Sequence, residues 1–185
     1  MTKIISVFGS STPESGSEPF VSAYLAGRLL AEAGFAVATG GYGGTMTAVS
    51  QGASEVGGHV IGVTSDQIEE FRPIGPNEWV KEEIRHKTLR DRLLHLIVHN
   101  DGMIVLPGGI GTLSEMTLAW SFLQVGEIEK RPLILLGELW QQTIAAFNDT
   151  RYVRQENLDL LTFVDSAEMA VSALQAELQS GKGAK

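Results

Sequence analysis

Short apolar runs alternate along the chain with longer segments in which apolar residues recur every three or four positions. Continuous apolar runs of this length are typical of strands buried on both faces, whereas the wider spacing is typical of helices. The predicted strands are 4–8, 35–39, 59–63, 103–106, 133–136 and a short one at 161–164. The predicted helices are 20–30, 46–56, 89–98, 113–125, 140–147 and 166–178.

This alternation of strand and helix predicts an α/β fold built on a parallel sheet. Right-handed crossovers make it a doubly wound, Rossmann-like sheet with helices on both faces. No repeat or linker interrupts the pattern, so residues 1–185 are expected to form a single domain whose tail, 180–185, is frayed. Residues 66–83 are the least regular part and are expected to form a loop over the ligand-carrying edge of the sheet.

Composition narrows the possible functions. Fourteen Lys and Arg residues against 22 Asp and Glu residues give a formal net charge of −8, which argues against nucleic acid as a partner. Cysteine is absent, which excludes disulfides, thiolate nucleophiles and cysteine-ligated metals. No His, Asp and Glu spacing is typical of a metal site, and no cofactor is expected. Without a secretory signal pattern or an apolar run of about 20 residues, we expect a cytoplasmic protein that does not enter the membrane.

Three predicted strands end in loops that are rich in glycine, at 9–12, 40–45 and 107–112. Glycine lets a phosphate approach backbone N–H groups, and the helix after each loop presents its positive end to an anion. The alternative is that these glycines only form tight turns. In the first two loops the candidate binding residues are Gly9, Ser10, Gly40 and Gly41. Neither the dinucleotide fingerprint nor the Walker motif is present, so the loops indicate a mononucleotide or sugar phosphate.

Glu115 follows the third loop and has two interpretations. Thr112 and Glu115 have the spacing of a capping box, in which the carboxylate would bond the Thr112 N–H. Alternatively, Glu115 lies one turn inside a helix whose first turn holds a phosphate, about one ribose away from it. A carboxylate there can orient water and stabilise an oxocarbenium-like sugar.

A basic run at 85–92 stands out in this acidic chain and is expected to open the helix before the third loop. Most of it fits a solvated helix start. Arg85, Arg92 and His99 are spaced by sevens, which would place them on one helix side, with Arg92 reaching the cleft to bind a phosphate or ribose hydroxyl. His95 and His99 are expected to be structural or surface residues.

The segment 107–115, Pro-Gly-Gly-Ile-Gly-Thr-Leu-Ser-Glu, resembles the signature of the LOG (LONELY GUY) family, whose members were long labelled lysine decarboxylases. Looser similarity covers 7–11, 40–46 and 57–63. The resemblance implies a Rossmann-like homodimer or larger oligomer that hydrolyses the N-glycosidic bond of AMP or cytokinin riboside 5′-monophosphates. It also implies that Glu115 and Arg92 are catalytic. The residues that it assigns to the 5′-phosphate are Gly108, Gly109, Gly111 and Thr112.

Two departures from the family pattern favour an alternative function. Leu93 stands where the family has a lysine, and the second glycine loop is compact. A compact loop also occurs in relatives that bind nucleotide-like ligands without known hydrolysis, such as molybdenum-cofactor carriers. The alternative is therefore a non-catalytic carrier or sensor of a nucleotide or of the molybdenum cofactor.

Two further expectations concern the lysines and the helix at 113–125. A pyridoxal phosphate enzyme needs a buried lysine, and the lysines here are terminal or in charged surroundings, so decarboxylation is rejected. The helix at 113–125 is apolar nearly all round. This indicates either a helix buried within the domain or, as we favour, a homodimer interface.

Overall fold

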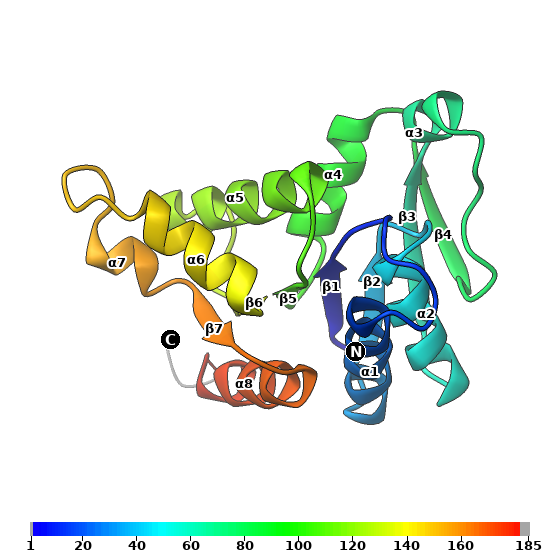
Figure 1. Cartoon of the computed structure of the whole chain (residues 1–185), viewed down its shortest axis with the longest axis horizontal. Helices are drawn as coiled ribbons and strands as arrows, with labels where there is room; N and C mark the ends of the chain where they lie inside the picture. The colour runs from blue at the N-terminus through cyan, green and yellow to red at the C-terminus, as the bar shows by residue number, and fades with distance from the viewer. Residues whose placement is uncertain (1, 182–185) are drawn as a thin grey trace.

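The computed structural model describes residues 2–181 and places seven strands in one sheet, all of whose strand pairs are parallel (Figure 1). The strand order is β4-β3-β2-β1-β5-β6-β7. Their bounds are β1 (Ile4–Phe8), β2 (Ala36–Thr39), β3 (Val60–Ser65), β4 (Glu82–His86), β5 (Gly102–Val105), β6 (Leu133–Leu136) and β7 (Thr162–Val164). The predicted α/β parallel sheet is confirmed.

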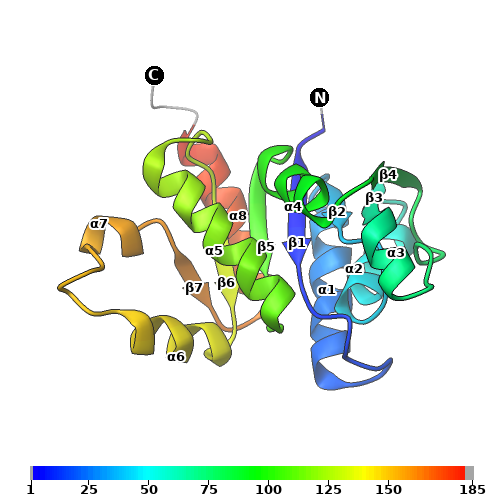
Figure 2. The same ribbon diagram turned by 90° about the horizontal axis from the view of Figure 1, so that it is seen from above.

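Helices cover both faces of this sheet (Figures 1 and 2). One face packs against α1 (Glu18–Glu32), α2 (Thr45–Glu55) and α8 (Ala167–Ser180). The other face packs against α4 (Leu89–Val98), α5 (Ile110–Val125) and α6 (Glu138–Phe147). Two short helices, α3 (Asp66–Phe71) and α7 (Gln155–Leu158), complete the set. None of the helices in the described range is long and apolar enough to cross a membrane.

The strands supply both cores because successive side chains point to opposite faces. In β5, Met103 and Val105 join the core under α4, α5 and α6. Ile104, between them, joins the core under α1, α2 and α8. This double burial explains why the central strands read as continuous apolar runs in the sequence.

Two elements differ from the sequence prediction. Residues 66–83 were expected to be a loop, but they begin with the helix α3. Residues 82–86 form the edge strand β4, which pairs with β3 so that Val63 lies beside Ile84. Four of the five β4 residues are polar, so no apolar run marks the strand. Of the tail expected to fray, Ser180 ends α8, and residues 182–185 lie outside the described range.

The contact between α1 and α2 is close because two glycines face the partner helix. A Cβ on Gly27 would collide with the backbone carbonyl of Val49, and a Cβ on Gly52 would collide with that of Tyr24. Both collisions involve backbone atoms, which cannot move aside as a flexible side chain can. The contact fixes α2, whose first residue follows the second glycine loop.

We expect Gly27→Ala to destabilise the protein, although alanine is the better helix former by about 1 kcal/mol. Overpacking against a backbone carbonyl costs about 1–3 kcal/mol or more and outweighs that gain. The check is the free energy of unfolding in urea. Gly75→Ala is the control, because no atom lies within 4 Å of a Cβ placed there. Equal stability of both variants and the parent protein would contradict this packing.

Candidate active site

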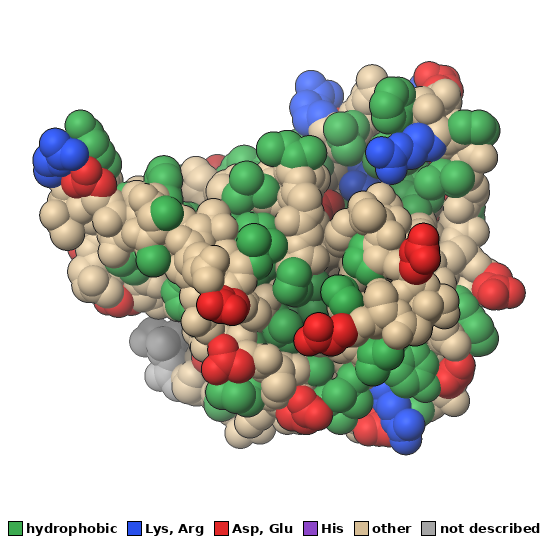
Figure 3. All heavy atoms as spheres, viewed as in Figure 1, with side chains coloured by type: hydrophobic (Ala, Val, Ile, Leu, Met, Phe, Trp, Pro, Cys, Tyr) green, Lys and Arg blue, Asp and Glu red, His purple; other side chains and the backbone are tan. Residues whose placement is uncertain are grey.

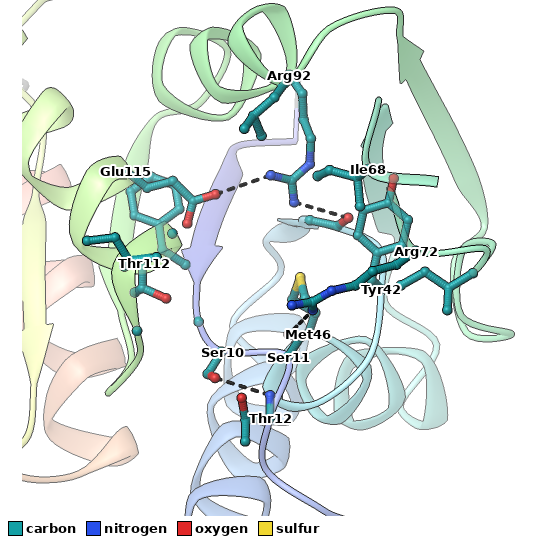
Figure 4. Close-up of a pocket in the computed structure, with 18 of the residues that line it drawn as sticks. Ser10, Ser11, Thr12, Tyr42, Met46, Ile68, Arg72, Arg92, Thr112 and Glu115 are labelled. Atoms are coloured by element: carbon teal, nitrogen blue, oxygen red, sulfur yellow. Dashed lines mark hydrogen bonds and ion pairs between the residues drawn. The ribbon is translucent and has the colours of Figure 1, made fainter. Parts of the chain in front are cut away.

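The three glycine loops meet at the carboxyl edge of the sheet and line one cavity of about 390 Å³ (Figure 4). The cavity lies beside β1, where the strand order changes direction. From β1 the chain adds β2, β3 and β4 on one side of the sheet, and it then adds β5, β6 and β7 on the other side. Ligands of open α/β sheets bind at such a point. The loop residues that line it are Gly9, Ser10, Ser11, Thr12, Gly40, Tyr42, Gly109, Ile110, Gly111 and Thr112.

Backbone contacts fasten the first loop to the second. The Thr45 N–H and hydroxyl both donate to the Ser10 carbonyl, at 2.8 and 3.0 Å. Gly44 has φ +65°, and a Cβ there would collide with the backbone of Ser10 and Ser11. Only glycine fits this approach, so the loop at 9–12 is held in place beside the cavity.

Gly41 and Gly108 were predicted to bind substrate but do not line the cavity. The Gly41 N–H donates to the Thr39 hydroxyl at 3.1 Å, and its carbonyl accepts from the Asn77 backbone N–H at 2.7 Å. A Cβ on Gly108 would collide with the Thr112 side chain. Both glycines thus shape the turns that bring their neighbours to the cavity.

The predicted capping box is wrong. α5 begins at Ile110 with Gly109 at the N-cap, and its first helical bond runs from the Leu113 N–H to the Gly109 carbonyl at 2.9 Å. Thr112 therefore lies inside the first turn, and Glu115 does not fold back onto it. Within residues 2–181, the N–H groups of residues 109–112 have no hydrogen-bond acceptor. These free donors and the positive end of the helix dipole favour an anion.

Arg92, on α4, crosses the crevice at its base. It is only 6% exposed. Its Nε donates to the Val63 carbonyl at 2.8 Å and its Nη2 to the Gly40 carbonyl at 3.3 Å. Its Nη1 lies 3.5 Å from Oε1 of Glu115, on α5 (Figure 4). The guanidinium thus bonds protein groups from three different elements.

Glu115 is 7% exposed and lines the cavity. Burial raises the pKa of this carboxyl to about 7, and the nearby Arg92 charge opposes the rise. No described residue forms a hydrogen bond with its Oε2. A carboxyl with such a pKa exchanges a proton near neutral pH, which is the requirement for a general base or acid.

Tyr42 packs beside the ion pair of Arg92 and Glu115. The sequence analysis did not identify this residue. Its ring lies 5.7 Å from the Arg92 guanidinium carbon. Its hydroxyl accepts from the Ser65 N–H at 2.9 Å, and burial raises the pKa of this phenol. The sequence feature that could have identified Tyr42 is its place inside a glycine loop. An aromatic ring in such a loop has to pack against residues that line the site.

The helical spacing predicted for Arg85, Arg92 and His99 is wrong. Arg85 lies on β4 and pairs with Asp66 at 2.7 Å, while His99 caps the end of α4. The helix starts only at Leu89, after the Thr88 N-cap, so the three residues share no helix side. Arg92 alone of the three lines the cavity.

The segment expected to lie over the ligand edge does so, but as a helix and an extended stretch. It supplies an apolar wall that the sequence analysis did not identify, formed by Ile68, Phe71 and Ile74. Arg72 lies beside these residues and also lines the cavity. Phe71 is 80% exposed and Ile74 is 41% exposed, so the wall is open to a ligand.

The described lysines do not suit pyridoxal phosphate chemistry. Among residues 2–181, each lysine is exposed or half-buried, and none lines the cavity. In the same range, no group of three or more His, Cys, Asp or Glu side chains is arranged to hold a metal ion.

A family model described as "Possible lysine decarboxylase" matches residues 46–174. Two curated relatives carry the name cytokinin riboside 5′-monophosphate phosphoribohydrolase. That of Mycobacterium tuberculosis is 30% identical over 159 residues, covering 78% of this chain and 83% of its own length. That of Arabidopsis thaliana, LOG5, is 36% identical over 98 residues, covering 53% of this chain. The match spans only 42% of the Arabidopsis protein.

Among solved structures, similarity extends over nearly the whole chain. The molybdenum cofactor carrier protein of Chlamydomonas reinhardtii has a TM-score of 0.74 at 24% identity and covers 97% of this chain and 99% of its own. The molybdenum cofactor binding protein of Rippkaea orientalis has a TM-score of 0.75 at 24% identity, covering 95% and 97%. At these identities the likeness shows the shared fold alone. The family match and the mycobacterial relative go further, and the chain belongs to the possible lysine decarboxylase family, the LOG family that its third glycine loop and Glu115 resemble.

Proposed function

We propose that the protein hydrolyses the N-glycosidic bond of a nucleoside 5′-monophosphate, either AMP or a cytokinin riboside 5′-monophosphate. The products are the free base and ribose 5-phosphate. The observation that carries the proposal is the buried Glu115 carboxyl, with its pKa of about 7, one turn from the free N–H groups of the third loop. The names of the curated relatives support the same reaction.

The third loop binds the 5′-phosphate in this proposal. The N–H groups of Gly109, Gly111 and Thr112 donate to phosphate oxygens, and Gly108 keeps the turn tight enough for them to do so. Gly9, Ser10 and Gly40 line the rest of the cavity beside the ribose and base. An anchored phosphate holds the sugar at a fixed distance from Glu115, which is how binding energy positions the reacting bond.

Glu115 then acts at C1′ of the ribose. As the bond from C1′ to the base nitrogen breaks, positive charge develops on the sugar, and the ionised carboxylate stabilises it. Water adds its oxygen to C1′ and gives a proton to Glu115, while the base keeps the bonding electron pair and takes a proton from solvent. Glu115 then returns its proton to solvent, so that one water is added across the bond. Arg92 is a positioning residue, because its Nη1 contacts Glu115 while Nε and Nη2 donate to the carbonyls of Val63 and Gly40 and hold the guanidinium in place.

A second candidate is a carrier that binds a nucleotide or the molybdenum cofactor without reaction. The compact second glycine loop and the fold shared with molybdenum cofactor carriers favour it. The two candidates differ in what they require of Glu115. A carrier needs only the cavity and its donors, whereas hydrolysis needs the carboxylate.

Replacing the carboxylate separates these candidates. Glu115→Gln keeps the side chain's size and its ability to accept a hydrogen bond from Arg92, but it cannot take a proton. We expect adenine release from AMP to fall about 10²–10⁴-fold while AMP still binds. Release is followed by chromatography and binding by calorimetry.

The control for that experiment is Glu127→Gln, an exposed glutamate just beyond the end of α5, which should release adenine at the parent rate. Undiminished turnover by Glu115→Gln would remove Glu115 from the mechanism. Tight binding by the parent protein with no base released from either AMP or isopentenyl-AMP would favour the carrier.

The raised pKa of Glu115 predicts a pH dependence. Because the ionised carboxylate is the active form, kcat/KM should rise with pH and level off above about 7. Well below that pH it should fall about tenfold per unit. The measurement uses kcat/KM, because this ratio reports the pKa values of the free enzyme. The substrate phosphate also titrates near pH 6, and its ionisation is divided out of the profile. A flat profile from pH 5 to 9, or a kcat/KM that falls with rising pH, would contradict the assignment.

We also propose a homodimer or larger homo-oligomer. Met116, Ala119 and Trp120 are buried within the chain, which accounts for part of the apolar surface of α5. The rest stays open, since Val125 is 71% exposed and Phe147, on the neighbouring α6, is 60% exposed. Light scattering at micromolar concentration should give at least twice the mass of the chain, and Phe147→Glu should lower it. A monomeric parent protein would contradict the proposal.

A further inference from the structure

Arg72 differs from the other arginines in what it bonds. Within residues 2–181, every other arginine contacts a carboxylate or, in the case of Arg131, backbone carbonyls. Arg72 has neither kind of partner there, and its only hydrogen bond from the side chain is to the Ser11 hydroxyl, at 3.4 Å. Its charge is therefore unneutralised by the described part of the chain.

The position of Arg72 makes this free charge significant. Arg72 follows α3, and its side chain points into the cavity toward Ser11, in the loop after β1 (Figure 4). The guanidinium carbon also lies 5.8 Å from the centre of the Phe71 ring. The side chain thus links the apolar wall to the loop after β1.

A bound 5′-phosphate needs such a charge. The chain carries a net charge of −8, and Lys and Arg side chains are sparse on the face that Figure 3 shows. The helix end supplies only about half a unit charge, against nearly two on the phosphate. Among residues 2–181, Arg72 and Arg92 are the two cations that line the cavity, and Arg92 is already bonded to Val63, Gly40 and Glu115.

We propose that Arg72 is the counter-ion of the ligand's 5′-phosphate. β1 and β5 are neighbours in the sheet and flank the crevice, so the Ser11 loop and the third glycine loop face each other across it. From Ser11, the guanidinium donates to oxygens of a phosphate held on residues 109–112. The inference rests on the proposed function, since it takes the ligand to be a nucleoside monophosphate.

The test compares ligands with and without phosphate. Calorimetry gives Kd for AMP, ribose 5-phosphate and adenosine, in a Glu115→Gln background so that no ligand is consumed. Adding Arg72→Ala should weaken binding of AMP and ribose 5-phosphate about 10- to 100-fold, as expected for a lost hydrogen bond to a charged group. Adenosine should bind as before or remain undetected, and Arg72→Lys should restore part of the loss.

Arg154→Ala is the matched control, because Arg154 is an exposed arginine paired only with Glu156. It should leave all three Kd values unchanged. A Kd for AMP and ribose 5-phosphate within twofold of the parent value in Arg72→Ala would overturn the inference, as would an equal loss for adenosine. Thermal unfolding verifies that both variants fold.

The two proposals fail in different ways. If the parent protein releases no base from AMP but Arg72→Ala still weakens binding of ribose 5-phosphate, the role of Arg72 is supported and the proposed hydrolase function is wrong. If the parent protein releases base and Arg72→Ala leaves KM for AMP unchanged, the proposed hydrolase function is supported and the role of Arg72 is wrong.

Discussion

The buried charge of Arg92 is the constraint on which the candidate site depends. An isolated charge in a protein interior costs several kcal/mol, so its partners must be brought to it. They come from three elements, namely the Val63 carbonyl in β3, the Gly40 carbonyl after β2 and the Glu115 carboxyl of α5. A Cβ on Gly40 would collide with the guanidinium, so this glycine serves the arginine as well as the turn.

The same pairing sets the chemistry of Glu115. Burial favours the neutral carboxyl and Arg92 favours the ionised form, and the balance leaves the pKa near 7. A fully solvated glutamate would stay ionised at neutral pH and be a weak base. The pKa of Glu115 therefore depends on where α5 begins. With Gly109 at the N-cap, the Glu115 side chain points to the cavity and not back to the backbone of the first helical turn.

Much of the fold was predictable from local pattern. The strands on either side of the crevice, β1 and β5, are buried on both faces and read as mostly apolar runs, with Ser6 the polar residue in β1. β4 has no such run, because an edge strand with polar side chains needs no apolar burial. α3 was missed for a related reason, since none of its residues is buried and its apolar residues face a cavity. The predicted start of α5 was wrong because Thr112 and Glu115 have the spacing of a capping box, although the N-cap residue is Gly109.

The sequence by itself determined the alternation of strands and helices, the three glycine loops and the presence of Glu115 and Arg92 near them. These follow from periodicity and residue type, which act over a few positions of the chain. Only the tertiary structure decided that Arg92 bonds Glu115, and that Arg72 lines the cavity without a carboxylate partner among residues 2–181. Burial and charge pairing depend on residues far apart in the chain, and these come together only when the sheet has formed.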